Sequence, residues 1–317
     1  MSEVGYFLSS EEHAASALLR HARQAEEAGF ASAWISDHYH PWTDEQGEAS
    51  FVWCVIGGIA ATTSLQLTTG VTCPTIRIHP AVMAQAAATA AEMMPGRFRF
   101  GLGSGENLNE HILGDHWPPA HVRLEMLEEA VEVMRRLWEG SMVNHDGRHY
   151  RVENARIYSL PGGPPPVPIS AFGPHALALA ARIGDGLVST SADAETVQRY
   201  RAEGGKGPAI AGMKVCWGTD EAAARRTAHR LWAQTGVPGE LPQELPTPAH
   251  FEQASSLVTE DQVAESIVCG PDPERHVAAI EQYFEAGFDE VFVCQVGADQ
   301  EGFFDFYRSE LRPRLAS

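Results

Sequence analysis

The stretch that decides the fold is Ala33-Trp34-Ile35-Ser36-Asp37-His38-Tyr39-His40-Pro41-Trp42. Its first three residues are apolar and follow a helical pattern that Gly29 closes, so they are predicted to form a buried strand. A carboxylate, an imidazole and an indole come directly after them. α/β barrels place their chemistry at such carboxyl ends of strands, and a histidine there can accept a proton near neutral pH. The alternative is a turn whose polar residues only cap the next element.

Short β-like runs alternate with helical patterns on both sides of this stretch. The predicted strands are residues 4–8, 33–36, 65–72, 98–103, 167–171, 186–190, 213–217 and 289–295. The predicted helices include residues 11–28, 52–61, 81–94 and 121–139. About eight β runs interleaved with helices predict an α/β fold of the (β/α)8 TIM-barrel type. The competing doubly wound sheet lacks its Gly-x-Gly-x-x-Gly turn, because Ser9-Ser10-Glu11-Glu12 stands there and is typical of a helix N-cap.

Two regions interrupt this alternation. Residues 141–166 are predicted to contain short strands over 148–152 and 156–159 and to end in a Pro- and Gly-rich run. Residues 218–260 are predicted to be mostly helical and then rich in turns and prolines. Long insertions in a barrel cover the catalytic mouth or build a subunit contact. We therefore expect one domain over residues 1–317 with these two insertions.

Composition excludes several classes of protein. The 317 residues are 44% hydrophobic, enough for a full core, and the formal net charge of −19 repels nucleic acid and anionic membranes. No apolar stretch has the length of a membrane span, and residues 1–5 do not begin a signal peptide. The five cysteines are scattered and contain no Cys-x-x-Cys pair, so we expect no disulfide framework, no metal site and a cytoplasmic location.

Three more segments with site character follow predicted strands. The first is Gly101-Leu102-Gly103-Ser104-Gly105-Glu106-Asn107-Leu108-Asn109-Glu110, whose glycines allow close approach of a flat ligand and whose Glu106 would project into the mouth. The second is residues 70–75. The third, residues 171–175, leads into a helix expected to begin near Ala176, where free backbone N–H groups can bind a phosphate. Each could be a plain loop, but a barrel would bring all of them around one pocket.

Several motifs spread over nearly the whole chain are shared with one family. They are Ser36-Asp37-His38 with Pro41-Trp42, Pro74-Thr75 with His79-Pro80-Ala81-Val82, Gly103-Ser104-Gly105-Glu106 with Leu108-Asn109-Glu110, Gly173-Pro174 and Gly184-Asp185-Gly186. On these motifs the chain resembles the luciferase-like (bacterial luciferase superfamily) flavin and deazaflavin oxidoreductases. Within that group it is most similar to the deazaflavin-dependent glucose-6-phosphate dehydrogenase branch.

The resemblance implies coenzyme F420 at the barrel mouth and a dehydrogenase reaction. His38 matches the base that takes the hydroxyl proton as hydride leaves the carbon, and Glu106 matches the acid that serves the reduced ring. Trp42 would form an apolar wall and Asp37 would orient the site. The implied cofactor-binding residues are Asp37, Gly70, Val71, Thr72, Gly105, Glu106, Asn109, Ala171, Phe172, Gly173, Pro174 and His175, with a non-prolyl cis peptide between Gly70 and Val71.

One departure from the branch concerns the substrate. The sugar-phosphate enzymes hold the phosphate with basic residues in three late segments, whereas the matching segments here, around Asp193, Ala264 and Glu301, contain acid and no Lys or Arg. A dianion facing unpaired carboxylates is strongly disfavoured. We expect these three residues and Trp42 to shape a pocket for a non-phosphorylated alcohol or sugar.

Three alternatives stay open. The first is an FMN-dependent monooxygenase on the same barrel. The second is a sugar-phosphate dehydrogenase in which Lys206, Lys214 or Arg199 replaces the missing charges. The third is a cofactor carrier without activity, although a pure binder needs neither an acid nor a base. Dimers are usual in the family, so we expect a homodimer.

Overall fold

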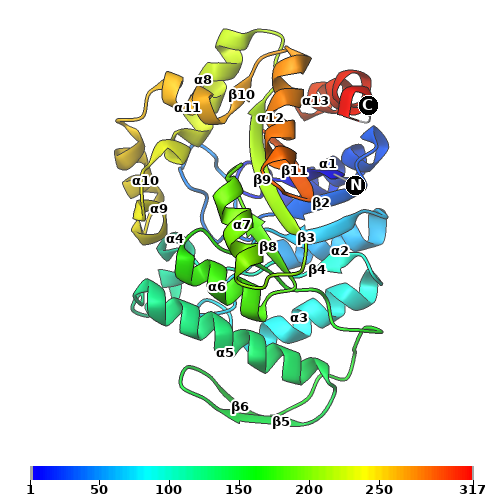
Figure 1. The fold of residues 1–317 in the computed structure, drawn as a ribbon, viewed down its shortest axis with the longest axis vertical. Helices are drawn as coiled ribbons and strands as arrows, with labels where there is room; N and C mark the ends of the chain where they lie inside the picture. Colours follow the sequence, from blue (N-terminus) through cyan, green and yellow to red (C-terminus); the bar gives the residue numbers. More distant parts are fainter. Residues whose placement is uncertain (1–2, 316–317) are drawn as a thin grey trace.

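The computed structural model describes residues 3–315, and a parallel barrel lies at the centre of the fold (Figure 1). Its wall consists of β1 (Glu3–Leu8), β2 (Ser32–Ile35), β3 (Gln66–Thr69), β4 (Phe98–Arg99), β7 (Pro168–Ser170), β8 (Gly186–Ser189), β9 (Ala209–Cys216) and β11 (Glu290–Gln295). These strands follow the order β4-β3-β2-β1-β11-β9-β8-β7. Leu102 then bridges Thr72 on one side and Ile169 on the other, which closes the sheet. The predicted (β/α)8 barrel is confirmed, and the doubly wound alternative is wrong.

Helices connect the strands and cover the outside of the barrel (Figure 1). They are α1 (Ala15–Ala28), α2 (Val52–Thr62), α3 (Pro80–Met93), α4 (Asn107–Glu110), α5 (Ala120–Trp138), α6 (Pro174–Ile183), α7 (Ala194–Ala202), α8 (Glu221–Trp232), α9 (Leu241–Glu244), α10 (Pro248–Ser255), α11 (Glu260–Ser266), α12 (Pro273–Glu285), α13 (Gln300–Phe306) and α14 (Arg312–Leu315). Single turns lie at η1 (His111–Leu113), η2 (Ala233–Gly236) and η3 (Tyr307–Leu311). Within residues 3–315 no helix is both long and apolar enough to cross a membrane.

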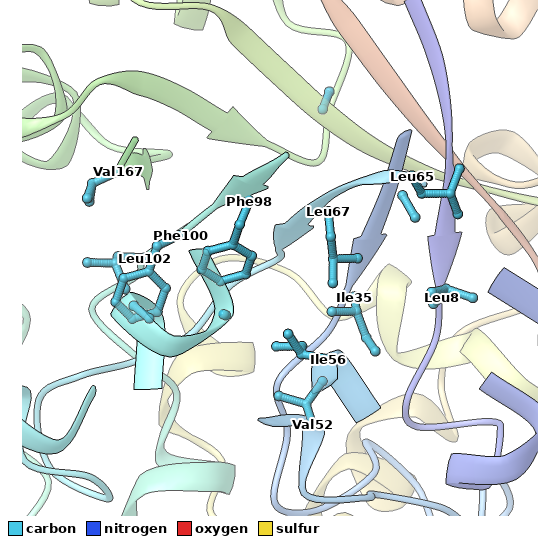
Figure 2. Close-up of a cluster of buried hydrophobic side chains, with 14 of the residues drawn as sticks. Leu8, Ile35, Val52, Ile56, Leu65, Leu67, Phe98, Phe100, Leu102 and Val167 are labelled. Atoms are coloured by element: carbon cyan, nitrogen blue, oxygen red, sulfur yellow. The ribbon is translucent and has the colours of Figure 1, made fainter. Parts of the chain in front are cut away.

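Alternation along the strands divides the apolar side chains between two cores. Phe7 and Trp34 face the inside of the barrel, where they pack with Phe292. Their neighbours in sequence, Leu8 and Ile35, face outward and belong to the core beneath the helices (Figure 2). Because side chains of successive strand residues point to opposite faces, an unbroken apolar run is buried on both sides. This is why the decisive stretch carries no polar residue before Ser36.

The first insertion is a β-hairpin that projects beyond α5 (Figure 1). Its strands are β5 (Val143–Asp146) and β6 (Arg151–Ala155), so the strands predicted at 148–152 and 156–159 are wrong. The amide of Gly147 donates to the carbonyl of Tyr150, which makes residues 147–150 the turn. The carboxylate of Glu129 on α5 accepts from the amides of His149 and Tyr150 and fixes that turn from a distant part of the chain.

The second insertion, residues 219–267, forms a lid that we define by α8, α9, α10 and α11. It is followed by β10 (Val268–Cys269), which pairs with β9. The lid contacts loops at the carboxyl ends of the barrel strands. The side chain of Gln46, after β2, donates to the carbonyl of Leu231, and that of Asn107, after β4, donates to the carbonyl of Glu244. The lid therefore adjoins the mouth of the barrel, as expected for an insertion in this fold.

Candidate active site

His38 lies between two carboxyl groups at the mouth of the barrel. Its Nδ1 is 3.5 Å from Glu11 Oε1 and 3.3 Å from the carbonyl oxygen of His40. Its Nε2 is 3.6 Å from Glu106 Oε2. Since both neighbours of Nδ1 are acceptors, the proton of the neutral imidazole belongs on Nδ1, which leaves the Nε2 lone pair able to accept a proton. The Trp42 ring lies 5.0 Å from the imidazole, so the structure brings the three predicted catalytic residues together.

Glu11 is a site residue that sequence reasoning missed. The prediction that residues 9–12 cap the first helix is wrong, because α1 begins at Ala15 and Ala14 precedes it without a side-chain cap. Glu11 is instead 1% exposed and accepts from the hydroxyls of Ser9 at 2.9 Å and Ser36 at 2.7 Å. The signal that could have found it is the one that marked His38, a polar residue directly after a buried strand.

Asn109 joins the two loops that carry His38 and Glu106. Its side-chain oxygen accepts from the amides of Tyr39 at 2.9 Å and His40 at 3.1 Å, and its nitrogen donates to Glu106 Oε2 at 3.1 Å. Desolvation within the mouth raises the pKa of Glu106, and the nearby imidazole only partly offsets this effect. A carboxyl whose pKa is raised is a better proton donor near neutral pH, as the predicted role of Glu106 requires.

Asp37 has different surroundings from those expected for a cofactor contact. Its carboxylate is buried and accepts from Arg77 at 2.9 Å and from the Thr72 hydroxyl at 2.8 Å. Arg77 also lies 3.5 Å from Glu110, whose second oxygen accepts from the Arg77 amide at 2.8 Å. Desolvation raises the pKa of Glu110 to about 7 even with this partner. The side chain of Asp37 thus fixes the loop that carries His38 to the β3 side of the mouth.

The backbone around β3 and β4 has the predicted shape for a flat ligand. The Gly70–Val71 peptide is cis, as the resemblance implied, and the Trp34 indole donates to the Gly70 carbonyl at 2.7 Å. Gly105 has a φ of +89°, and a Cβ there would lie 2.6 Å from the sulfur of Cys73. Only glycine satisfies both conditions, so the loop before Glu106 can pack closely against Cys73 and hold Glu106 at the mouth.

The expected phosphate-binding segment lies at the start of α6. This helix begins at Pro174, two residues earlier than predicted, because Gly173 is the N-cap and proline is favoured in the first turn. The Phe172 side chain is half exposed, and a Cβ on Gly173 would meet no atom within 4 Å. The N-terminus of α6 is therefore open at the level of the mouth.

Residues 1–290 match the model of the luciferase-like monooxygenase family. The chain belongs to this family. The resemblance stated from the sequence motifs is thereby confirmed.

Relatives within this luciferase-like family cover the whole chain. An F420-dependent glucose-6-phosphate dehydrogenase from Beutenbergia cavernae is 36% identical over 329 residues, covering 99% of this chain and 98% of the relative. An F420-dependent hydroxymycolic acid dehydrogenase from Mycobacterium tuberculosis is 35% identical over 323 residues, covering 98% of this chain and 88% of the relative.

Solved structures share the same architecture. An F420-dependent secondary alcohol dehydrogenase in complex with an F420–acetone adduct has a TM-score of 0.92, 29% identity and 99% coverage of both chains. An F420-dependent tetrahydromethanopterin reductase from Methanopyrus kandleri, at 22% identity and a TM-score of 0.80, supports the fold alone.

Of the four predicted substrate residues, Trp42 packs against His38, whereas the structure of residues 3–315 shows no contact of Asp193, Ala264 or Glu301 with His38 or Glu106. Asp193 is exposed and caps α7, where it accepts from the Glu195 amide at 3.0 Å. Glu301 is exposed in the first turn of α13, and Ala264 lies half-buried on α11. Their part in the pocket of this luciferase-like barrel stays a prediction.

Glu12 and Lys214 form a second polar group at the mouth; the sequence suggested Lys214 only as a replacement for a missing phosphate-binding charge and did not suggest Glu12 as a site residue. Glu12 accepts from the Trp232 indole at 2.6 Å and from the Gly297 amide at 2.8 Å, and so ties the lid to the barrel. Desolvation raises the pKa of Glu12 to about 7, although Lys214 opposes this. The ammonium of Lys214 lies 4.1 Å above the same indole.

Proposed function

We propose that this protein is an F420-dependent dehydrogenase that transfers hydride from a CH–OH carbon to the deazaflavin. The observation that carries the proposal is His38 held between Glu11 and Glu106 at the mouth of a luciferase-like barrel. Hydride can leave an alcohol carbon only as the hydroxyl proton is removed, which an imidazole does well near neutral pH. The F420-dependent dehydrogenases among the relatives support the choice of cofactor.

The residues at the mouth fit coenzyme F420. The backbone at Gly70, Val71, Thr72 and Gly105 ends the strands beside Glu106 and can face a flat ring system, and the free N-terminus of α6 suits a phosphate on the tail. The residues that would hold the cofactor are Gly70, Val71, Thr72, Gly105, Glu106, Asn109, Ala171, Phe172, Gly173, Pro174 and His175. Asp37 would contribute its main chain alone, because its buried carboxylate is bonded to Arg77 and Thr72. When bound, the deazaflavin supplies the hydride acceptor.

Each side chain of the site then has a separate task. His38 takes the hydroxyl proton on Nε2, while the carboxylate of Glu11 stabilises the resulting imidazolium through Nδ1. Glu106 supplies the proton that the reduced ring requires, with its position fixed by Asn109. Trp42 excludes water beside the imidazole and is itself held by an edge contact with Phe251 of the lid.

The proposed substrate is a non-phosphorylated alcohol or sugar. The three segments that would face a substrate phosphate carry Asp193, Glu265 and Glu301, and Asp193 and Glu301 are exposed, which makes that region acidic. Of the cations that could replace the missing charges, Lys206 is exposed and Arg199 is in the last turn of α7. Lys214 is half-buried at the mouth, where the carboxyls of Glu11 and Glu12 lie near it, so a phosphate dianion would meet several carboxyls as well as this one cation.

Steady-state kinetics with F420 and paired substrates tests the proposal. We expect glucose or secondary alcohols to reduce F420 with a kcat/KM at least tenfold above that of glucose 6-phosphate, because a like-charge contact can cost several kcal/mol (about 1.4 kcal/mol per tenfold). A clear preference for the phosphate would contradict the substrate assignment. Reduction of F420 by none of the compounds would contradict the dehydrogenase itself.

We also propose a homodimer in the cytoplasm. On the outer face of α2 and α3, Val82 and Met93 are each more than 40% exposed and line a groove of about 290 Å³ together with Trp53 and Ile56. Such a contiguous apolar face is typical of a subunit interface. The five cysteines are all free thiols, as favoured in a reducing compartment. Sedimentation equilibrium of the wild type and of Val82→Asp tests the dimer, since a charge in the interface should yield monomers.

A further inference from the structure

Lys214 points into the barrel at the mouth. On β9 the residues two and four positions before it, Gly212 and Ile210, face the barrel interior, and the period of a strand places Lys214 on the same side. Its ammonium lies 5.6 Å from the centre of the Phe7 ring, which is an interior residue of β1. Lys214 pairs in register with Cys294, so it belongs to the uppermost layer of interior side chains.

This layer is continuous with the catalytic residues. The charge of Lys214 acts on the pKa of both Glu12 and Cys294, and Glu11 acts on the same two groups. Glu11 in turn contacts the imidazole of His38. Trp232, the ring beside the ammonium, packs in the same cluster as Trp42, whose ring lies 5.0 Å from the imidazole of His38, so the ammonium and the base lie at the same mouth.

The three N–H groups of Lys214 have no acceptor in the described part of the chain. No carboxylate oxygen lies within 4 Å of its nitrogen there, and no hydrogen bond to it is formed; its neighbours are the faces of two aromatic rings. The residue is only half-buried and its nitrogen is accessible to solvent, so an oxygen of water or of a substrate can accept from it. The rings hold the ammonium in place while its donors stay available.

We propose that Lys214 binds a second, uncharged oxygen of the substrate, beside the hydroxyl that His38 deprotonates. This inference rests on the proposed dehydrogenase function and narrows its substrate to diols, sugars and related polyols. An anionic second group is disfavoured because the carboxyl of Glu12 is bonded to the indole beside the ammonium and the carboxyl of Glu11 lies nearby, so the charge of Lys214 is already partly offset. A simple secondary alcohol would leave the ammonium without its acceptor.

Three four-carbon substrates test which second group Lys214 prefers, because each of them is oxidised at a secondary alcohol carbon next to a methyl group. Butan-2-ol carries no second oxygen group beside the reacting hydroxyl. Butane-2,3-diol carries a neutral hydroxyl, and 3-hydroxybutanoate carries an anionic carboxylate. With F420 in the holoenzyme we expect kcat/KM for the diol to exceed that for butan-2-ol by about tenfold or more, because sites built to hydrogen-bond a hydroxyl reject analogues that lack it. The acid should be the poorest substrate of the three.

Variants at the two lysines of the chain assign the preference to Lys214. In Lys214→Met the diol-to-butanol ratio should fall close to one, and Lys214→Arg should recover part of it, since arginine keeps the charge and the donors. Lys206 is exposed, so Lys206→Met should keep the wild-type ratio. Equal kcat/KM values for all three substrates would be consistent with the proposed dehydrogenase function but would overturn the role of Lys214. A ratio that survives in Lys214→Met would overturn it as well, as would a preference for the acid.

Binding can be observed without turnover, which separates this inference from the proposed function. Protein labelled with ¹³C-lysine should give two lysine side-chain signals, assigned by the same variants. Titration of the holoenzyme that holds reduced F420, which cannot accept hydride, with butane-2,3-diol should shift the Lys214 signal and leave that of Lys206 in place. Failure of the diol to shift the Lys214 signal more than butan-2-ol does would contradict the inference, even if the diol reduces oxidised F420 in turnover.

Discussion

At the scale of single residues, the proposed mechanism depends on the different surroundings of the two ring nitrogens of His38. Acceptors at Nδ1 fix the tautomer, and Nε2 is left for the proton of the substrate. Glu11 and Glu106 are thus not equivalent, because one stabilises the charged imidazole and the other serves the opposite side of the site. Because of this asymmetry, we expect substitutions of the two residues to affect different steps of the reaction.

Replacement of the base should remove turnover and spare cofactor binding. We expect His38→Ala to lower kcat by about 10²- to 10⁴-fold, the usual cost of losing a general base, with the affinity for F420 within a few fold of wild type. Stopped-flow reduction of F420 and a fluorescence titration of the cofactor measure the two quantities. Near-wild-type turnover in the variant would show that another group takes the proton.

Replacement of the acid should affect the chemical step more than binding. Glu106→Gln keeps the shape of the side chain and can still accept from Asn109, but it cannot donate the proton. We expect kcat to fall while KM changes less, as for an interaction made in the transition state. If Glu106→Gln reduces F420 at the parent rate, Glu106 is only a loop residue.

At the scale of elements, Arg77 holds three segments of the mouth together. Its guanidinium lies between the carboxylates of Asp37, after β2, and Glu110, on α4, and both carboxylates are buried. Removing the cation would leave two like charges facing each other without solvent. The geometry of the mouth thus depends on a residue that would itself not meet the substrate.

The loss of this cation should be strongly destabilising. We expect Arg77→Met to lower the free energy of unfolding by about 3–5 kcal/mol, the typical cost of breaking a buried ion pair by removing one partner. Arg308→Met is the matched control, because Arg308 pairs with Asp305 on the surface and such pairs contribute about 1 kcal/mol or less. Urea unfolding of both variants measures the difference, and equal effects would contradict a structural role for Arg77.

The elements that the sequence predicts well are those governed by local patterns. The barrel strands are apolar runs with polar ends, and these ends already placed His38, Glu106 and residues 171–175 at the predicted mouth. The hairpin was misplaced because its turn depends on Glu129, a carboxylate on α5 that no local pattern connects to Tyr150. Glu11 was missed for a different reason: a Ser-Ser-Glu-Glu run is equally compatible with a helix cap and with a buried loop, and the cap was chosen although the run directly follows a buried strand.

At the scale of the whole molecule, buried titratable groups make stability depend on pH. His21 on α1 is buried against His13, and desolvation lowers its pKa from 6.5 to about 3. The unfolded chain binds a proton on this histidine below pH 6.5 and the folded chain does not, so stability is lost as the pH falls. Glu12 and Glu110, with pKa values raised to about 7, act in the opposite direction, since their contribution is lost as the pH rises from about 4.5 to 7.

A variant can isolate the histidine contribution. Because only the unfolded chain protonates His21, lowering the pH from 6.5 to 5 should lower the free energy of unfolding by about 2 kcal/mol through this residue. His21→Leu should abolish that part of the acid sensitivity. Urea unfolding of the wild type and the variant at the two pH values gives the comparison. The same pH dependence in both proteins would show that His21 titrates normally in the fold.

The central claim is that hydride moves directly from an alcohol carbon to F420 with His38 as the base. The most direct measurement is anaerobic single-turnover reduction of F420 by a substrate deuterated at the carbinol carbon, with mass analysis of the cofactor. The account predicts loss of the visible band of oxidised F420 without oxygen, a slower rate for the deuterated substrate, and one deuterium on the reduced cofactor. Reduction that requires FMN and oxygen, or deuterium found in the solvent in place of the cofactor, would contradict it.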